Sequence, residues 1–393
     1  MTDPGAGKLH LAVALDGAGW HPAAWREPDA RPAELFSASY WVDVVTEAER
    51  SGLDFVTIED GLSLQSADRY QRDRRTDQVR GRLDAVLIAA RVAPLTSHVG
   101  LIPTVIGTHT EPFHVSKAIA TLDWVSSGRA GVRVRVSARP DEFAHFGRRE
   151  PPSGIEGVAD RFAEAADYVE VLRRLWDSWE DDAEIRDVTT GRFVDRDKLH
   201  YIDFSGRWFS VKGPSITPRP PQGQPPVAAL AHATVPYQLV ASSADIGFVT
   251  PHDGAQATAI VTEIRDLQAA AGRTSDTVHV FGDLLVYLDD SQGLAADRKA
   301  RLDEQAGAEY RSDALTFTGT AAQLADLMLS WHSTGLTGFR LRPATIPHDL
   351  DQITGALVPQ LRRWRAVREK YSAPTLRGLL GLPHPADRYA SAR

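Results

Sequence analysis

The segment of residues 99–138 constrains the fold of this chain more than any other. Residues 99–106 form an apolar run rich in β-branched side chains, and the polar loop GTHT at 107–110 ends it abruptly. Apolar side chains at helical spacing follow Pro112, a residue type that suits the first turn of a helix. A second apolar run completes the segment. This order predicts a strand, a helix and a parallel strand joined by a right-handed crossover, with the 107–110 loop where ligands bind in such folds.

The same alternation of apolar runs and amphipathic helical patterns continues along the chain. Eight runs are predicted as strands, at residues 9–15, 54–59, 99–106, 131–138, 227–233, 246–250, 278–288 and 338–343. No internal repeat or low-complexity linker divides the chain, so we expect one α/β domain over residues 1–393, a (β/α)8 or TIM barrel with insertions. An open doubly wound sheet is the competing layout. It usually carries a GxGxxG turn after the first strand, and LDGAGW at residues 15–20 lacks that spacing.

Several segments do not fit the repeating unit. Residues 63–81 and 140–152 are predicted as loops. Residues 180–226 begin with an acidic stretch and then place aromatic residues between glycines and prolines, so we interpret them as an inserted segment that packs over the barrel mouth or forms an interface. Residues 372–393 are predicted as a C-terminal tail, either docked or loose. The run LTFTGT at 315–320 fits a short extra strand or a loop.

The composition argues against several classes of function. The net charge is −8, with 44 basic and 52 acidic residues interspersed, so neither nucleic acid nor an anionic membrane is an expected partner. No apolar run approaches the roughly 20 residues that span a bilayer, and the first ten residues lack the apolar segment of a signal peptide. The chain has no cysteine, which excludes disulfides, thiolate catalysis and Cys-ligated metal centres. We therefore expect a cytoplasmic enzyme.

In such a barrel, functional residues lie at the C-terminal ends of the strands. Asp60 follows the second predicted strand, where its carboxylate can bind a ligand or close an Asx turn onto Gly61. Arg133 and Arg135 alternate with valines, so they share one face of the fourth strand. They either line a wet mouth that faces an anionic ligand or pair with acidic residues such as Asp60. The same rule also nominates Asp16, residues 104–110, Ser137, residues 232–234, Thr250 and Arg342.

Three histidines, His21, His109 and His145, lie in loops expected at the mouth and are the candidates for catalysis. None belongs to a metal-ligand motif, so we predict no metal site. The chain contains neither the G-x-S-x-G elbow of serine hydrolases nor a phosphate-binding P-loop, and no pair of catalytic carboxylates stands out. An enzyme of this composition is therefore expected to use a bound organic cofactor.

Longer motifs resemble the luciferase-like flavin monooxygenases. They are LDFVTIEDGL, GLIPTVIGTHTEPFHVSKAIATLDWVSSGRAG, RFAEAADYVEVLRRLWDSWEDDA, GRFVDRDKLHYIDFSGRWFSVKGP and TLRGLLGLPHP. The chain is most similar to the nitrilotriacetate, dibenzothiophene-sulfone and pristinamycin-type branch, over residues 9–385. The resemblance implies a homodimeric TIM barrel that takes reduced FMN from a separate NAD(P)H-dependent flavin reductase. It also implies that one oxygen atom of O2 enters a small organic substrate through a flavin peroxide or hydroperoxide.

The resemblance also implies which residues contact the flavin. The positions concerned are Asp60, Thr104, Gly107, Arg133, Ser137 and Thr234. Arg133 stands where the family usually has a flavin-contacting Asn, and Tyr237 replaces a small residue. Val158 and Phe162 replace a His and a Tyr that contact the flavin phosphate or ribityl chain.

These departures leave three functions open. The first is a two-component monooxygenase that uses reduced FMN, with Arg133 or Arg135 supplying charge to the flavin. The second is an oxidoreductase of the same superfamily that depends on the deazaflavin F420. The third is a flavin-free barrel that binds a partner or catalyses a cofactor-independent reaction. It is suggested by Val158 and Phe162, whose side chains cannot donate hydrogen bonds.

Overall fold

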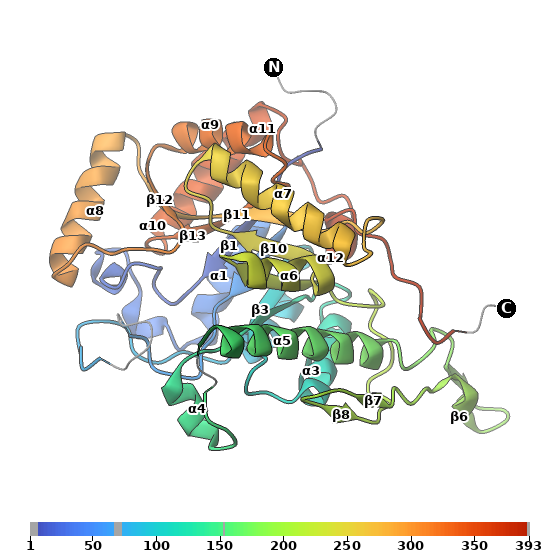
Figure 1. The fold of residues 1–393 in the computed structure, drawn as a ribbon. Coiled ribbons are helices and arrows are strands. Elements are labelled where there is room, and N and C mark those ends of the chain that lie inside the picture. The colour runs from blue at the N-terminus through green and yellow to red at the C-terminus, as the bar shows by residue number, and fades with distance from the viewer. Residues whose placement is uncertain (1–6, 67–72, 152–153, 391–393) are drawn as a thin grey trace.

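Eight parallel strands close into a barrel in the computed structural model, which describes residues 7–66, 73–151 and 154–390 (Figure 1). In order around the barrel they are β1 (His10–Leu15), β2 (Phe55–Ile58), β3 (Gly100–Ile106), β4 (Val132–Arg135), β9 (Val227–Ala231), β10 (Ile246–Val249), β11 (His279–Leu288) and β13 (Gly338–Pro343). Each strand pairs with the next, and β13 pairs with β1, so the sheet closes on itself. The predicted TIM barrel is confirmed.

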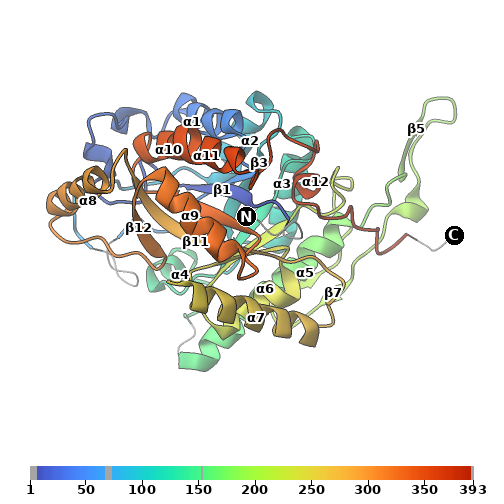
Figure 2. The same ribbon diagram turned by 90° about the horizontal axis from the view of Figure 1, so that it is seen from above.

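Helices surround the barrel on its outer side (Figures 1 and 2). They are α1 (Ala38–Ser51), α2 (Ala85–Val92), α3 (Pro112–Val125), α5 (Gly154–Trp176), α6 (Thr234–Ser243), α7 (Gly254–Ala270), α8 (Gln292–Ala306), α9 (Ala321–His332), α10 (His348–Gln352), the π-helical turn η5 (Ile353–Leu357) and α11 (Val358–Arg363). A short additional helix, α4 (Pro140–Phe146), occupies part of the predicted loop 140–152. Among the described residues, none of the helices combines the length and the apolar character that crossing a bilayer requires.

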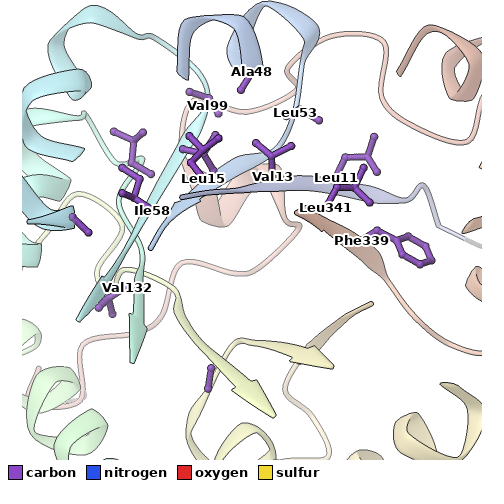
Figure 3. Packing of buried hydrophobic residues seen from close by; sticks show 14 of the residues in the cluster. Leu11, Val13, Leu15, Ala48, Leu53, Ile58, Val99, Val132, Phe339 and Leu341 are labelled. Atoms are coloured by element: carbon purple, nitrogen blue, oxygen red, sulfur yellow. The ribbon is translucent and has the colours of Figure 1, made fainter. Parts of the chain in front are cut away.

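The alternation of side chains along β1 explains how helices and barrel pack. Leu11, Val13 and Leu15 point outward into a core cluster shared with the surrounding helices (Figure 3). Ala12 points the other way and joins a second cluster inside the barrel. A strand buried on both faces in this manner is typical of parallel barrels, and it is why the strands appear as nearly continuous apolar runs in the sequence.

A ninth strand and two hairpins lie outside the barrel. The ninth strand, β12 (Leu315–Gly319), pairs with the second half of β11, so the run LTFTGT is a strand. Within residues 180–226, β5 (Glu184–Asp187) pairs with β6 (Arg192–Val194), and Figure 2 shows β5 reaching away from the barrel. The second hairpin joins β7 (Phe204–Ser205) to β8 (Ser210–Val211).

The C-terminal segment closes the barrel at the N-terminal ends of its strands. Leu376, Leu380 and Leu382 pack against the phenylalanines that fill this end of the interior. The Leu376 N–H donates to the carbonyl of Gly128 at 2.9 Å, which fixes the segment in place. The described part of the predicted tail is therefore docked, and ligands must enter from the opposite end. Residues 391–393 of the tail and 67–72 of the predicted loop 63–81 lie outside the described residues.

Leu380→Ala is expected to lower the free energy of unfolding by about 2–5 kcal/mol, because it removes apolar atoms from this closed end of the barrel. Urea unfolding followed by tryptophan fluorescence measures the change. Leu87→Ala, at an exposed position on α2, is the matched control and is expected to change stability by less than about 0.5 kcal/mol. An equal effect of both substitutions would contradict this account of the docked segment.

His279 predicts a pH dependence of the same region. Its Nε2 donates to the Leu380 carbonyl at 2.8 Å, and burial lowers the pKa of His279 from 6.5 to about 4. Between these values the unfolded chain binds a proton that the folded protein does not, so stability falls as the pH is lowered through this window. From pH 7 to pH 5, the wild type is expected to lose about 2 kcal/mol more than His279→Gln in urea unfolding. Parallel pH profiles would contradict the shift.

Candidate active site

A cavity of about 750 Å³ opens at the C-terminal ends of the strands. Its walls come from the loops after β1 and β2, from β4 and α4, and from the segment that precedes β12. Three aromatic residues line it, Trp20, Trp25 and Tyr310. Burial raises the pKa of the Tyr310 phenol to about 12, so this group keeps its proton at neutral pH and can donate a hydrogen bond. We call this space the mouth cavity.

Asp60 lines the mouth cavity, as expected for a residue that follows β2. One carboxylate oxygen accepts a hydrogen bond from the Gly61 N–H at 2.7 Å, and the other accepts one from the Ala85 N–H at 2.9 Å. The first contact joins adjacent residues, one position short of the contact that defines an Asx turn, and the second ties the loop to the start of α2. Burial raises the pKa of Asp60, and these two backbone donors oppose the rise. The side chain thus holds the Gly61 loop at the edge of the cavity.

Arg133 lies beneath the cavity floor and is only 3% exposed. Its Nη2 donates to a carboxylate oxygen of Glu59, and its Nε donates to the hydroxyl of Thr104 at 2.9 Å. Burial lowers the pKa of Arg133 to about 10, and the charge of Glu59 opposes this shift. Arg133 therefore pairs with an acidic partner, which is Glu59 rather than Asp60, and Thr104 serves as its acceptor.

This pair belongs to a larger ion network, which is buried except at Asp313. Its members are Glu59, Arg133, Asp283, Asp313, Arg340 and Arg342. Arg340 contacts Glu59 at 3.4 Å and Asp283 at 2.5 Å, and Arg342 joins Asp283 to Asp313. Three cations and three anions balance one another, so the network as a whole carries no net charge. Only its two ends, Glu59 and Asp313, line the mouth cavity.

The other three predicted flavin-binding positions lie apart from the mouth cavity. Gly107 is buried, and a side chain there would meet Val134. Ser137 is buried, and its N–H donates to the Thr108 hydroxyl at 2.9 Å. Thr234 begins α6 and is exposed. Of the six predicted positions, the structure thus places Asp60 in the cavity wall and Thr104 and Arg133 under its floor.

The candidate histidines occupy three different environments. His21 lines the mouth cavity, but its Nδ1 accepts from the Ala23 N–H at 3.1 Å and its Nε2 donates to Asp303 at 3.2 Å. Burial lowers the pKa of His21, so the ring is held neutral with both nitrogens engaged. His109 lines a separate cavity of about 160 Å³, between the rings of Phe143 and Phe146. His145 is exposed on α4. None of the three lies in the mouth cavity with a free nitrogen.

Sequence reasoning missed several charged residues of the mouth cavity, among them Arg82 and Glu142. Arg82 binds Asp16 through three contacts, at 3.2, 2.9 and 2.7 Å, and so joins the loops after β1 and β2. Glu142 lines the cavity from α4. The only available signal for Glu142 was its position shortly after a strand end, because the short helix that carries it was not predicted.

The mouth cavity fits an aromatic, anionic cofactor of the size of a flavin. Its volume lies in the range of sites for such ligands, and its aromatic walls and arginines offer stacking and charge. The positions at the start of α5, Val158 and Phe162, cannot donate to a phosphate. Among the described residues, no three His, Asp or Glu side chains are grouped so that they could hold a metal ion.

Comparisons with known proteins agree on one family. The model of the family described as luciferase-like monooxygenase matches residues 18–332. Nitrilotriacetate monooxygenase component A of Aminobacter aminovorans is 27% identical, over 98% of this chain and 99% of its own length. N-acetyl-S-(2-succino)cysteine monooxygenase of Bacillus subtilis is 28% identical, over 98% of each chain. The crystal structure of riboflavin lyase with modified FMN and riboflavin superposes with a TM-score of 0.85 at 24% identity, over 96% of this chain and 97% of that one.

Arg133→Met is expected to lower the free energy of unfolding by about 3 kcal/mol, because Glu59 then keeps only the longer contact with Arg340. The double variant Glu59→Gln/Arg133→Met is expected to recover part of this loss, since it removes the unpaired charge. Arg148→Met breaks a surface pair with Glu111 and is the control, with an expected loss below about 1 kcal/mol. Urea unfolding distinguishes these outcomes, and equal losses at the two arginines would contradict the role of the network.

Proposed function

The chain belongs to the luciferase-like monooxygenase family, and we propose that it is the oxygenase of a two-component system that uses reduced FMN. A separate NAD(P)H-dependent flavin reductase would supply the flavin. The mouth cavity carries this proposal. It is large enough for a flavin, and aromatic and arginine side chains line it. The relative named as component A of a monooxygenase supports the two-component arrangement.

The proposal includes the assembly and its substrate. The chain acts in the cytoplasm as a homodimer of a single barrel domain, with residues 180–226 as an insertion and 372–393 as a C-terminal extension. Its substrate is a small organic molecule. The loops that line the mouth cavity would determine which one.

A reduced flavin, when bound, supplies the electrons that activate O2 for transfer of one oxygen atom to the substrate. The residues of the chain position the reactants and keep water away from them. Asp60 fixes the Gly61 loop through its two backbone contacts. Trp20 and Tyr310 occupy the wall and exclude water from it, and the Tyr310 hydroxyl keeps its proton for donation to a ligand. Glu59 and Asp313 present a floor whose charges the network beneath them balances.

One observation favours a second candidate, a flavin-free barrel. The side chains of Val158 and Phe162 offer no hydrogen bond to a phosphate, and Thr234 is exposed on α6. A barrel that lost flavin binding would keep the same fold and the same cavity for another ligand. Flavin binding itself distinguishes the two candidates.

The test is an anaerobic titration of the protein with reduced FMN and, in parallel, with reduced F420, followed through tryptophan fluorescence. Saturable binding of FMN, with a long-lived absorbance change after mixing with O2, is the expected result. Binding of F420 instead would assign the chain to the deazaflavin-dependent branch. Binding of neither would overturn the proposal and favour the flavin-free barrel.

Asp60→Ala is expected to weaken binding of reduced FMN about tenfold and to divert O2 to hydrogen peroxide, because the Gly61 loop loses two hydrogen bonds to a carboxylate. Asp253→Ala is the matched control, since Asp253 accepts from the Gln256 N–H at 2.7 Å at the start of α7, outside the cavity. This variant is expected to lose stability but to bind flavin as the wild type does. Equal flavin affinity and coupling in Asp60→Ala would remove Asp60 from the site.

A further inference from the structure

Arg135 is a cation of the mouth cavity that lacks a carboxylate partner. It is the last residue of β4, and its Nη1 donates to the main-chain carbonyl of Asp60 at 2.6 Å. Within the described ranges 7–66, 73–151 and 154–390, no carboxylate lies at ion-pair distance from this guanidinium. A guanidinium has five N–H donors, so most of its capacity is available to a ligand in the cavity. The neighbouring Arg82 differs, because Asp16 already balances its charge.

Glu142 is the complementary group, an anion of the same cavity without a cation partner among the described residues. Its side chain is almost fully buried, with 1% of the residue exposed. One carboxylate oxygen accepts from the Leu62 N–H at 3.1 Å, whereas the buried Oε2 has no hydrogen-bond partner in the described part of the chain. Leaving a buried carboxylate oxygen without a donor is unfavourable, and a ligand that supplies an N–H removes this penalty.

The two groups meet at Gly61. A Cβ atom built on Gly61 would lie 3.1 Å from Nη1 of Arg135 and 3.9 Å from Oε1 of Glu142, and Nη1 of Arg82 borders the same position at 3.1 Å. Both groups therefore border one small space, although they are not at ion-pair distance from each other. The absence of a side chain at residue 61 lets these groups approach one another, because a Cβ atom there would be crowded by the guanidinium groups. Trp20 and Tyr310 line the same cavity and offer an apolar surface for the rest of the molecule.

We propose that Arg135 and Glu142 bind the substrate of this enzyme, and that this substrate carries a carboxylate next to an amine or amide N–H. Arg135 donates to the carboxylate, and Oε2 of Glu142 accepts the N–H. The inference rests on the proposed function only in calling the ligand a substrate. A site that offers both the donors of Arg135 and the acceptor of Glu142 prefers amino- and amidocarboxylates. Simple anions lack the N–H, and neutral apolar molecules lack both groups.

Three matched probes test the proposal on the wild-type protein without flavin. N-benzoylglycine carries the carboxylate and the amide N–H, its methyl ester lacks the anion, and O-benzoylglycolate lacks the N–H. Titration calorimetry is expected to show that N-benzoylglycine binds about 10- to 100-fold more tightly than either analogue. Equal affinity for all three probes, or binding of none, would overturn the proposal.

Two substitutions assign each preference to its residue. Arg135→Gln is expected to remove the preference for the acid over its ester. Glu142→Gln keeps an oxygen for the Leu62 N–H and places an amide donor at the position of Oε2, so the preference for N-benzoylglycine over O-benzoylglycolate is expected to disappear or reverse. Arg311→Gln removes a charge from the exposed rim of the cavity and is expected to change each affinity less than about twofold. These readouts are ratios within one variant, so altered stability does not imitate them.

A flavin phosphate is the other anion that Arg135 could bind, and titrations with reduced FMN and reduced riboflavin separate the two sources. The proposal expects the ratio of their affinities to be the same in wild type and Arg135→Gln. A ratio that collapses in the variant, with the preference of the acid over its ester unchanged, would assign Arg135 to the flavin and overturn the proposal. Flavin binding without discrimination among the three probes would refute this inference alone. Probe discrimination without flavin binding would instead refute the proposed function.

Discussion

The buried ion network under the mouth cavity is the interaction on which the geometry of the cavity depends. It joins the end of β2 to β4, β11, β13 and the segment before β12, and these elements are distant in the sequence. Five of its six charges are buried, which is unfavourable unless every one is paired, and here three arginines and three carboxylates satisfy one another. Arg340 also lies 4.2 Å above the ring of Phe248, which belongs to the apolar cluster below. The network thus forms the boundary between the apolar interior and the ligand cavity.

The two ends of the barrel therefore have different tasks. At the N-terminal ends of the strands, phenylalanines and the docked C-terminal leucines fill the interior. At the C-terminal ends, the loops are long, and their charged and aromatic side chains surround an open volume. Stability and ligand binding are in this way assigned to opposite ends of the same eight strands, as is general for barrels of this kind. A substitution at Leu380 or His279 tests the closed end, and one at Asp60 or Arg135 tests the open end.

Much of the fold follows from local patterns in the sequence. Short apolar runs that alternate with helical periodicity are sufficient to predict eight strands and a closed barrel, because each strand is buried on both faces. A contact of the Asp60 carboxylate with the Gly61 backbone was predictable because the residues are adjacent, although it is not the Asx turn that was expected. The partner of Arg133 was not predictable. Glu59 is 74 residues away in the sequence, and the adjacent carboxylate of Asp60 was an equally plausible partner. Glu142 was overlooked because the short helix α4 has too few turns to show a period.

The network also explains why an arginine at position 133 changes the way this barrel can recognise a ligand. The family resemblance places a flavin-contacting Asn there, whereas Arg133 directs its donors to Glu59 and Thr104 beneath the floor. Arg135 is two residues further along the same face of β4, one layer closer to the open end. Glu59 pairs with Arg133 and is therefore not available to Arg135. Arg135 donates instead to a main-chain carbonyl, and its positive charge faces the mouth cavity. In the proposal above, recognition therefore lies one layer further out, in the space around Gly61 that Arg135 shares with Glu142.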